Sequence, residues 1–260
     1  MTASENHGSG KRLVTLLLLV LGVAVLQACA TPQAIEDELS ATWRGAKVFV
    51  PSGDPGSGVL VYPGNTSSWA DAVAREGLTP ATKIPAVIHL HGCDGLSSAD
   101  QRLGAFYARQ GFAYFGPDSF ARTGRTSWCR RGNMGSRIQW RLQEADYALQ
   151  QVEKIDWIDQ NRIVLSGFSE GAQAASAYYG RRYVAIVLLG TDCRAVGGSP
   201  RAPKDIPVIN IVGSNDDYGY GGGCAGKLSH KLVIANGSHD VSLEEEARQA
   251  LAEFLSGIKR

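Results

Sequence analysis

Residues 162–179 read RIVLSGFSEGAQAASAYY, a stretch in which a strand runs directly into a helix. Its first five residues have the composition of a buried strand, and residues 172–179 carry the small side chains of a closely packed helix. Between them, Gly167-Phe168-Ser169-Glu170-Gly171 fits the pattern G-x-S-x-G. A sharp strand-to-helix turn of this kind strains the serine and exposes its hydroxyl, and the flanking small residues clear the backbone. The stretch therefore predicts a nucleophile at Ser169; the alternative is a turn with a structural role only.

Strand-like and helix-like segments alternate on both sides of this turn. A leading hairpin is expected over residues 47–50 and 58–62. Further strands are expected at residues 84–90, 112–115, 183–189, 206–212 and 231–234, and further helices at residues 99–110, 136–154 and 243–258. Strands joined by helices imply right-handed βαβ units, so the expected fold class is α/β, with a mostly parallel central sheet and helices on both faces. In such sheets, functional residues gather at the carboxyl ends of the strands.

Length and charge narrow the class of protein. A chain of 260 residues with 44% hydrophobic content can bury one sizeable core, which we assign to residues 43–260. Lys and Arg total 26 and Asp and Glu total 25, so no strong field concentrates a polyanion at the surface. Nucleic-acid binding is therefore not expected.

The first 30 residues have the pattern of an export signal. Lys11 and Arg12 precede an apolar run over residues 13–26, which is shorter than the roughly 20 residues of a membrane-spanning helix. Leu26-Gln27-Ala28-Cys29 resembles a bacterial lipoprotein box, in which Cys29 would carry the lipid. Ala28-Cys29-Ala30 also fits ordinary signal cleavage, which would release a soluble periplasmic or secreted protein. The sequence favours the lipoprotein, held at the membrane of the bacterial periplasm by its lipid anchor.

The segment after the signal differs from the body of the chain. Residues 31–42 contain four acids or amides and few apolar side chains, and we expect them to form a linker between the anchor and the domain.

Four cysteines remain in the body of the chain. Disulfides persist in an oxidising compartment, so an exported protein is expected to pair Cys93, Cys129, Cys193 and Cys224. Four cysteines allow three pairings, and the spacing alone does not choose among them. Buried free thiols are the alternative.

A nucleophilic serine needs a base, and the base needs an acid that orients it, in the chain order Ser, acid, His. Only His230 and His239 follow Ser169. His230 enters the last expected strand, whereas His239 lies in the loop before the final helix, so His239 is the expected base. A surface histidine without a role is the alternative. The acid is expected in Gly213-Ser214-Asn215-Asp216-Asp217, where either carboxylate could reach the imidazole. We choose Asp216.

A second loop lies at the same edge of the expected sheet. His91-Gly92-Cys93-Asp94-Gly95 follows the first central strand, where the fold places a donor to a developing oxyanion. The expected donors are the backbone N–H groups of Cys93 and Glu170, each contributing ~3 kcal/mol to transition-state stabilisation. Their side chains are expected to matter less than their amides.

Taken together, these motifs resemble the dienelactone-hydrolase-like branch of the α/β-hydrolases. The resemblance covers residues 84–260 and rests on Leu90-His91-Gly92-Cys93-Asp94-Gly95, Pro117-Asp118-Ser119-Phe120 with Cys129, Gly167-Phe168-Ser169-Glu170-Gly171, and Gly213-Ser214-Asn215-Asp216-Asp217. It implies the α/β-hydrolase fold and a Ser169, Asp216, His239 triad that hydrolyses esters or lactones of small molecules without a metal or another cofactor. The founding dienelactone hydrolases carry a cysteine nucleophile where Ser169 stands, so dienelactone itself is not expected as the substrate.

The resemblance also implies a disulfide pairing. Cysteines recur at corresponding places in exported relatives, which pairs Cys93 with Cys129 and Cys193 with Cys224. Each bridge would pin one loop near the expected site, and closing a loop of this size contributes roughly 3 kcal/mol in the chain-entropy model.

Other residues bear on specificity. Arg122, Arg125, Arg130 and Arg131 cluster in one loop and suit a substrate carboxylate, although a solvated basic loop is equally expected. Residues 218–223, YGYGGG, indicate a loop with aromatic walls. Two rival functions remain, a peptidase of the same fold and a non-catalytic binding module that retains the fold.

Overall fold

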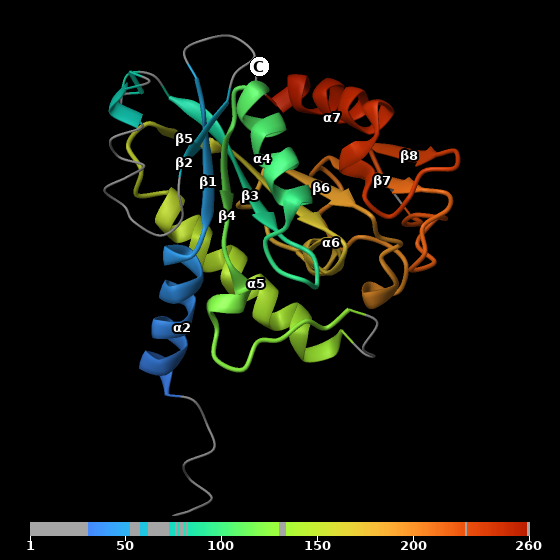
Figure 1. The fold of residues 1–260 in the computed structure, drawn as a ribbon, viewed down its shortest axis with the longest axis horizontal. Coiled ribbons are helices and arrows are strands. Elements are labelled where there is room, and N and C mark those ends of the chain that lie inside the picture. The colour runs from blue at the N-terminus through green and yellow to red at the C-terminus, as the bar shows by residue number, and fades with distance from the viewer. Residues whose placement is uncertain are drawn as a thin grey trace, which may run out of the picture. The chain divides into compact units, whose positions relative to one another are not determined.

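The computed structural model describes residues 31–52, 58–61, 73–75, 77, 78, 81, 83–129, 134–226 and 228–258. Contacts divide the chain into Met1–Asp37 and Glu38–Arg260. The second unit holds an eight-stranded sheet in the order β2-β1-β4-β3-β5-β6-β7-β8 (Figure 1). Its strands are β1 (Lys47–Pro51), β2 (Gly58–Val61), β3 (Ile84–Leu90), β4 (Ala113–Gly116), β5 (Ile158–Phe168), β6 (Ala185–Leu189), β7 (Val208–Gly213) and β8 (His230–Ile234).

The pairing of the strands agrees with the expected topology. β1 is antiparallel to both β2 and β4, which confirms the leading hairpin, and the pairs from β4 through β3 and β5 to β8 are all parallel. β5 begins four residues before the expected strand because its first residue, Ile158, pairs with Ile84 at the start of β3.

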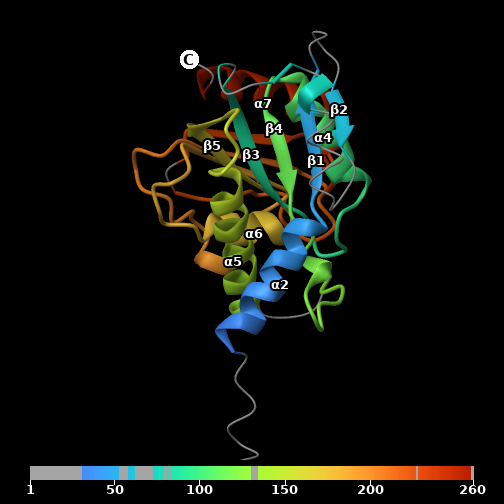
Figure 2. The same cartoon turned by 90° about the vertical axis from the view of Figure 1, so that its left-hand side faces the viewer.

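Two pairs of helices cover the sheet. They are α4 (Ser98–Arg109) with α7 (Glu245–Ile258), and α5 (Gly135–Val152) with α6 (Glu170–Ser176), the last two in contact with each other (Figure 2). Along β3, Ala86, Ile88 and Leu90 pack in the core with α5 and α6, whereas Val87 packs in the core with α4 and α7. This alternation, in a strand buried on both sides, confirms that helices cover both faces.

Local signals explain where the helices begin and end. Ser97 and Asp100 form a capping box at the start of α4, and Gly111 follows its last turn with φ +79°. The expected linker at residues 31–42 is helical instead, because α2 spans Pro32–Arg44. Thr42 is fully buried and the Trp43 ring stacks on Phe115, so the end of this segment is part of the packed domain.

The strand order, the antiparallel pair at one edge, the helices on both faces and the serine between β5 and α6 together define the α/β-hydrolase fold. The expected fold class is confirmed. In the part of the chain that the structure describes, every helix is too short or too polar to cross a bilayer.

Candidate active site

The turn at Ser169 is so tightly packed that only glycine fits at positions 167 and 171. A Cβ at Gly167 would lie 2.4 Å from the Gly171 carbonyl oxygen, and a Cβ at Gly171 would lie 1.9 Å from the Leu90 oxygen. The first residues of α6 therefore pack directly on the end of β3. Ser169 has φ +53° and ψ −114°, a conformation that an L-residue adopts only under strain. Its N–H donates to the carbonyl oxygen of Leu189, the last residue of β6, across 2.9 Å.

The structure brings Asp216 and His239 together. Asp216 Oδ2 lies 2.6 Å from His239 Nδ1, and Asp216 Oδ1 accepts the Tyr218 N–H at 2.8 Å. A carboxylate accepts hydrogen bonds, so Nδ1 carries the proton and Nε2 has the free lone pair. Of the two acids left open by the sequence, Asp216 makes this contact, whereas Asp217 lines the neighbouring cavity.

The His239 ring lies against the turn that carries Ser169. The His239 ring packs on Phe168, which precedes the serine, with ring centroids 5.1 Å apart. A Cβ at Gly190 would lie 3.2 Å from His239 Cε1, and Gly190 directly follows the carbonyl that accepts the Ser169 N–H. The three predicted residues follow the carboxyl ends of β5, β7 and β8, so they lie at one edge of the sheet.

The loop after β3 reaches the same place. A Cβ at Gly92 would lie 3.6 Å from the Ser169 Cβ, so the next residue, Cys93, stands beside the serine. Glu170 is the first residue of α6, and a helix does not use the N–H groups of its first turn internally. Cys93 and Glu170 line one cavity with Ser169.

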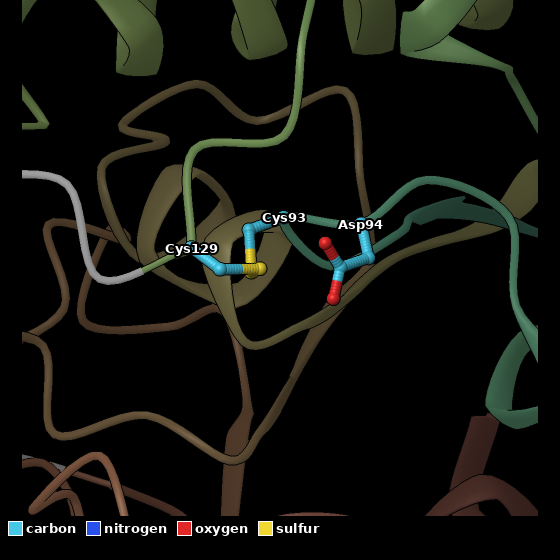
Figure 3. A group of neighbouring side chains, drawn as sticks. All are labelled: Cys93, Asp94 and Cys129. Carbon is cyan, nitrogen blue, oxygen red and sulfur yellow. A yellow bond between two sulfur atoms is a disulfide. The ribbon is translucent and has the colours of Figure 1, made fainter.

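Both disulfides have the pairing implied by the resemblance. They join Cys93 to Cys129 and Cys193 to Cys224. Figure 3 shows the first bridge beside Asp94, a group whose sulfur and carboxylate atoms lie within 4.8 Å of one another. The two sulfurs are bonded to each other, so they are not thiolates able to ligate a metal. Instead, the bridge ties the loop after β3 to the loop after β4, and Ser127 Oγ adds a 2.6 Å hydrogen bond to Asp94.

The cavity beside Ser169 has a volume of about 440 Å³. This is within the range of small-molecule sites. Trp128, Tyr218 and Tyr220 supply aromatic walls, and Arg137 and Arg194 supply positive charge. Tyr218 also packs on the His239 ring, with centroids 4.4 Å apart, so one aromatic wall contacts the predicted base.

The expectation that Arg122 and Arg125 hold a substrate carboxylate is wrong. Their side chains are 3% and 0% exposed. Arg122 pairs with Glu38 and Glu144, and Arg125 pairs with Glu170. Both guanidinium groups already have partners inside the protein. Arg130, Arg131 and Cys29 lie outside the described residues.

The partners of these arginines form a buried ionic cluster that the sequence did not predict. Arg141 and Glu144, both fully buried, pair at 2.8 Å, and Glu170 is 5% exposed. Burial raises the pKa of the Glu170 carboxyl above its ordinary value, while the charges of Arg141 and Arg125 oppose that rise. One signal was available: Arg141 and Glu144 occur on the apolar face of the amphipathic helix α5, where charged residues rarely occur unless paired.

A second Ser-His-Asp grouping lies inside the molecule. Ser166 Oγ is 2.9 Å from His89 Nδ1, and His89 Nε2 is 3.4 Å from Asp100. All three residues are 0% exposed, so a substrate cannot reach them. Burial alone would raise the pKa of Asp100, but hydrogen bonding and the charge of His89 hold that pKa below its ordinary value. Accessibility therefore selects Ser169 over Ser166 as the nucleophile candidate.

Comparison with known proteins gives distant structural similarity only. No sequence profile of a protein family matches the chain, and no curated protein matches it. Among solved structures, esterase 2 of Thermogutta terrifontis is similar at 16% identity with a TM-score of 0.48, covering 69% of this chain and 85% of that one. A Klebsiella pneumoniae protein assigned as dienelactone hydrolase is 16% identical with a TM-score of 0.46, covering 82% and 98%. Acylaminoacyl peptidase of Pyrococcus horikoshii is 11% identical with a TM-score of 0.48, covering 69% and 37%. These similarities add no evidence on activity, and the α/β-hydrolase fold of this chain is established by its own strand order.

Proposed function

We propose that the chain is a serine hydrolase that cleaves carboxylic ester or lactone bonds through an acyl-enzyme. The observation that carries the proposal is the Asp216–His239 pair, 2.6 Å between Oδ2 and Nδ1, packed against the strained turn that presents Ser169. A base oriented by an acid, next to a serine that lines an open cavity, is the arrangement that nucleophilic acyl transfer requires.

In the acylation step, His239 Nε2 takes the Ser169 proton as Oγ attacks the carbonyl carbon of the substrate. The carbonyl electron pair moves onto oxygen, and the N–H groups of Cys93 and Glu170 donate to that oxyanion. The pair then returns to re-form the carbonyl and breaks the bond to the leaving oxygen, which takes the proton from His239. The alcohol leaves, or stays attached when the substrate is a lactone. Asp216 stabilises the imidazolium between these two transfers.

In the deacylation step, His239 takes a proton from water, and the hydroxide oxygen attacks the acyl carbon. The second oxyanion collapses, the bond to Ser169 Oγ breaks, and the serine recovers its proton from His239. The carboxylic acid leaves and the enzyme is restored.

The cavity favours small ester substrates. Its volume of about 440 Å³ and its walls of Trp128, Tyr218 and Tyr220 suit a compact apolar or aromatic acyl group. Arg194 is exposed but is paired with Asp192 and lies over the Tyr220 ring, so it extends the wall on that side of the cavity.

A covalent probe tests the nucleophile. A fluorophosphonate should label the native protein, and Ser169→Ala and His239→Ala should abolish labelling, whereas Ser166→Ala should retain it. Absence of labelling of the native protein would reject a catalytic serine and favour a binding module. Short p-nitrophenyl esters should be hydrolysed and p-nitroanilide peptides should not; the reverse result would indicate a peptidase.

We also propose that the protein acts outside the cytoplasm, anchored by a lipid on Cys29. The two disulfides support an oxidising compartment, because such bonds are rare in reduced cytosol. Metabolic labelling with a clickable palmitate should mark the native protein and not Cys29→Ala. Equal labelling of both would refute the anchor.

A further inference from the structure

Arg125 occupies a fully enclosed position beneath the candidate site. Its Nη2 donates to Glu170 Oε1 at 2.7 Å, its Nε donates to Ser119 Oγ at 3.2 Å, and its Nη1 donates to the Thr126 carbonyl. The guanidinium carbon lies 3.8 Å from the Trp128 ring centroid and 4.7 Å from that of Phe120. Every nitrogen of the group therefore has a hydrogen-bond partner and two aromatic rings pack against it, which restricts its position.

One branch from Arg125 leads to the turn at Ser169. Glu170, its carboxylate partner, is the residue whose N–H we assign to the oxyanion. The other Glu170 oxygen, Oε2, is buried without a hydrogen-bond partner among the described residues, and Arg141 Nε lies 4.0 Å from Oε1. Arg125 thus makes the shortest charged contact to this side chain.

The other branch leads to the loop that carries Cys93. Ser119, which accepts from Arg125, donates its N–H to His91 Nε2 at 3.0 Å, so His91 Nδ1 carries the proton and donates to Gly92 O at 2.7 Å. Cys93 follows directly. The same loop is tied a second time by the disulfide to Cys129, four residues after Arg125.

We propose that Arg125 is a positioning residue for the two peptide donors of the oxyanion hole, Cys93 N–H and Glu170 N–H. It holds these two groups at the relative positions that binding of one oxyanion requires. The proposal rests on the proposed esterase function. The two donors belong to loops 77 residues apart in sequence. The pairing of β3 with β5 brings these loops together, and the contacts of Arg125 with Glu170 and Ser119 add a side-chain link between them that constrains the two donors further.

A purely stabilising role explains this arrangement less well. The desolvation of a buried ion pair commonly offsets its attraction, and apolar replacements of such pairs are often neutral in stability. Oxyanion donors, in contrast, act only when held within about 0.5 Å of the productive geometry. A planar guanidinium with a partner for each nitrogen and two aromatic rings packed against it provides such a constraint.

The test replaces both charges at once, so that no charged group is left buried alone. Arg125→Met with Glu170→Gln should lower kcat for phenyl acetate by about 10- to 100-fold and change KM by less than about threefold, since one lost oxyanion donor costs about 10²- to 10³-fold. The matched control, Arg181→Met with Asp205→Asn, removes an ion pair that is 65% and 62% exposed and should retain native kcat.

A second readout separates oxyanion binding from general damage. Sulfur accepts hydrogen bonds poorly, so the preference of the enzyme for phenyl acetate over O-phenyl thionoacetate should shrink in the double variant and stay native in the control. A native kcat, or a lowered kcat with an unchanged ester-to-thionoester ratio, would overturn the proposal. If the double variant does not fold, Arg125→Lys, which keeps the charge but not the stacked fork, is measured in the same way with the same criteria. Hydrolysis of neither substrate by the native protein, without fluorophosphonate labelling, would instead reject the proposed function itself.

Discussion

The disulfide between Cys93 and Cys129 should open before the one between Cys193 and Cys224. Cys93 and Cys129 are partly exposed at the cavity wall, whereas Cys193 and Cys224 are both 0% exposed in the core. Thiol–disulfide exchange requires a thiolate to reach a sulfur, so access sets the order of reduction. Mild reductant should therefore produce a form with two free thiols, at positions 93 and 129.

The two bridges are nearly equal in their effect on the unfolded chain. Their sequence separations are 36 and 31 residues. In the chain-entropy model these loops correspond to about 3.8 and about 3.7 kcal/mol at 25 °C. For a domain of this size, a loss of that magnitude lowers Tm by about 8–15 °C. A difference in the order of opening would thus reflect exposure rather than loop length.

The assay combines mass and function. Reductant is titrated against the native protein, free thiols are alkylated, and peptides are mapped while esterase activity and Tm are recorded. Cys93→Ala with Cys129→Ala should reproduce the partly reduced form, with a lower Tm and a lower kcat, because the loop bearing the Cys93 N–H has lost one tie. Simultaneous opening of both bridges, or first labelling at Cys193 and Cys224, would refute the reasoning from exposure.

Three further predictions concern single residues. Asp216→Asn should lower kcat by about 10⁴-fold with a near-native Tm, because the amide favours the wrong His239 tautomer. The kcat of Asp217→Asn should stay within about tenfold of the native value. Equal losses of kcat in steady-state assays would contradict the assignment of Asp216. Gly171→Ala should prevent folding or cost more than about 3 kcal/mol in urea unfolding, because the new methyl would meet backbone at Leu90 O, and a native Tm would refute this. Burial, and next the charge of Arg141, hold the pKa of His91 well below its ordinary value. Below about pH 6.5 the unfolded chain therefore binds this proton more readily than the folded protein, and the free energy of unfolding falls as pH decreases, by up to about 1.4 kcal/mol per pH unit. His91→Gln should remove this part of the pH dependence in denaturant titrations at about pH 7.5, 6.5 and 5.5.

Prediction from sequence worked best where the signal was local. Three of its signals depend on residues close together in the chain: the G-x-S-x-G turn, the alternation of strands and helices, and the acid and histidine after β7 and β8. The observed helices and strands agree with the order that these signals predicted. Residues 31–42 were the exception. They form most of a polar amphipathic helix that packs through Thr42 and Trp43, but their composition is that of a linker.

The loop arginines show the limit of such reasoning. In sequence, Arg122 and Arg125 resemble any basic surface loop, and their acidic partners are 84, 22 and 45 residues away. The choice between substrate binding and an internal ion pair depends on burial, which composition does not encode. Only the packing of α5 and α6 against this loop reveals that the charges are neutralised within the protein.

The sequence by itself determined the α/β architecture, the strained turn at Ser169 and the small set of acids and histidines that could serve it, because periodicity and steric limits act over a few residues. The tertiary structure alone decided that Asp216 rather than Asp217 contacts His239, that Ser166 is sealed off, and that Glu170 and Arg125 join two loops beneath the site. Those outcomes depend on which side chains lose water and which distant groups meet, and both are set by the packing of the whole sheet and its helices.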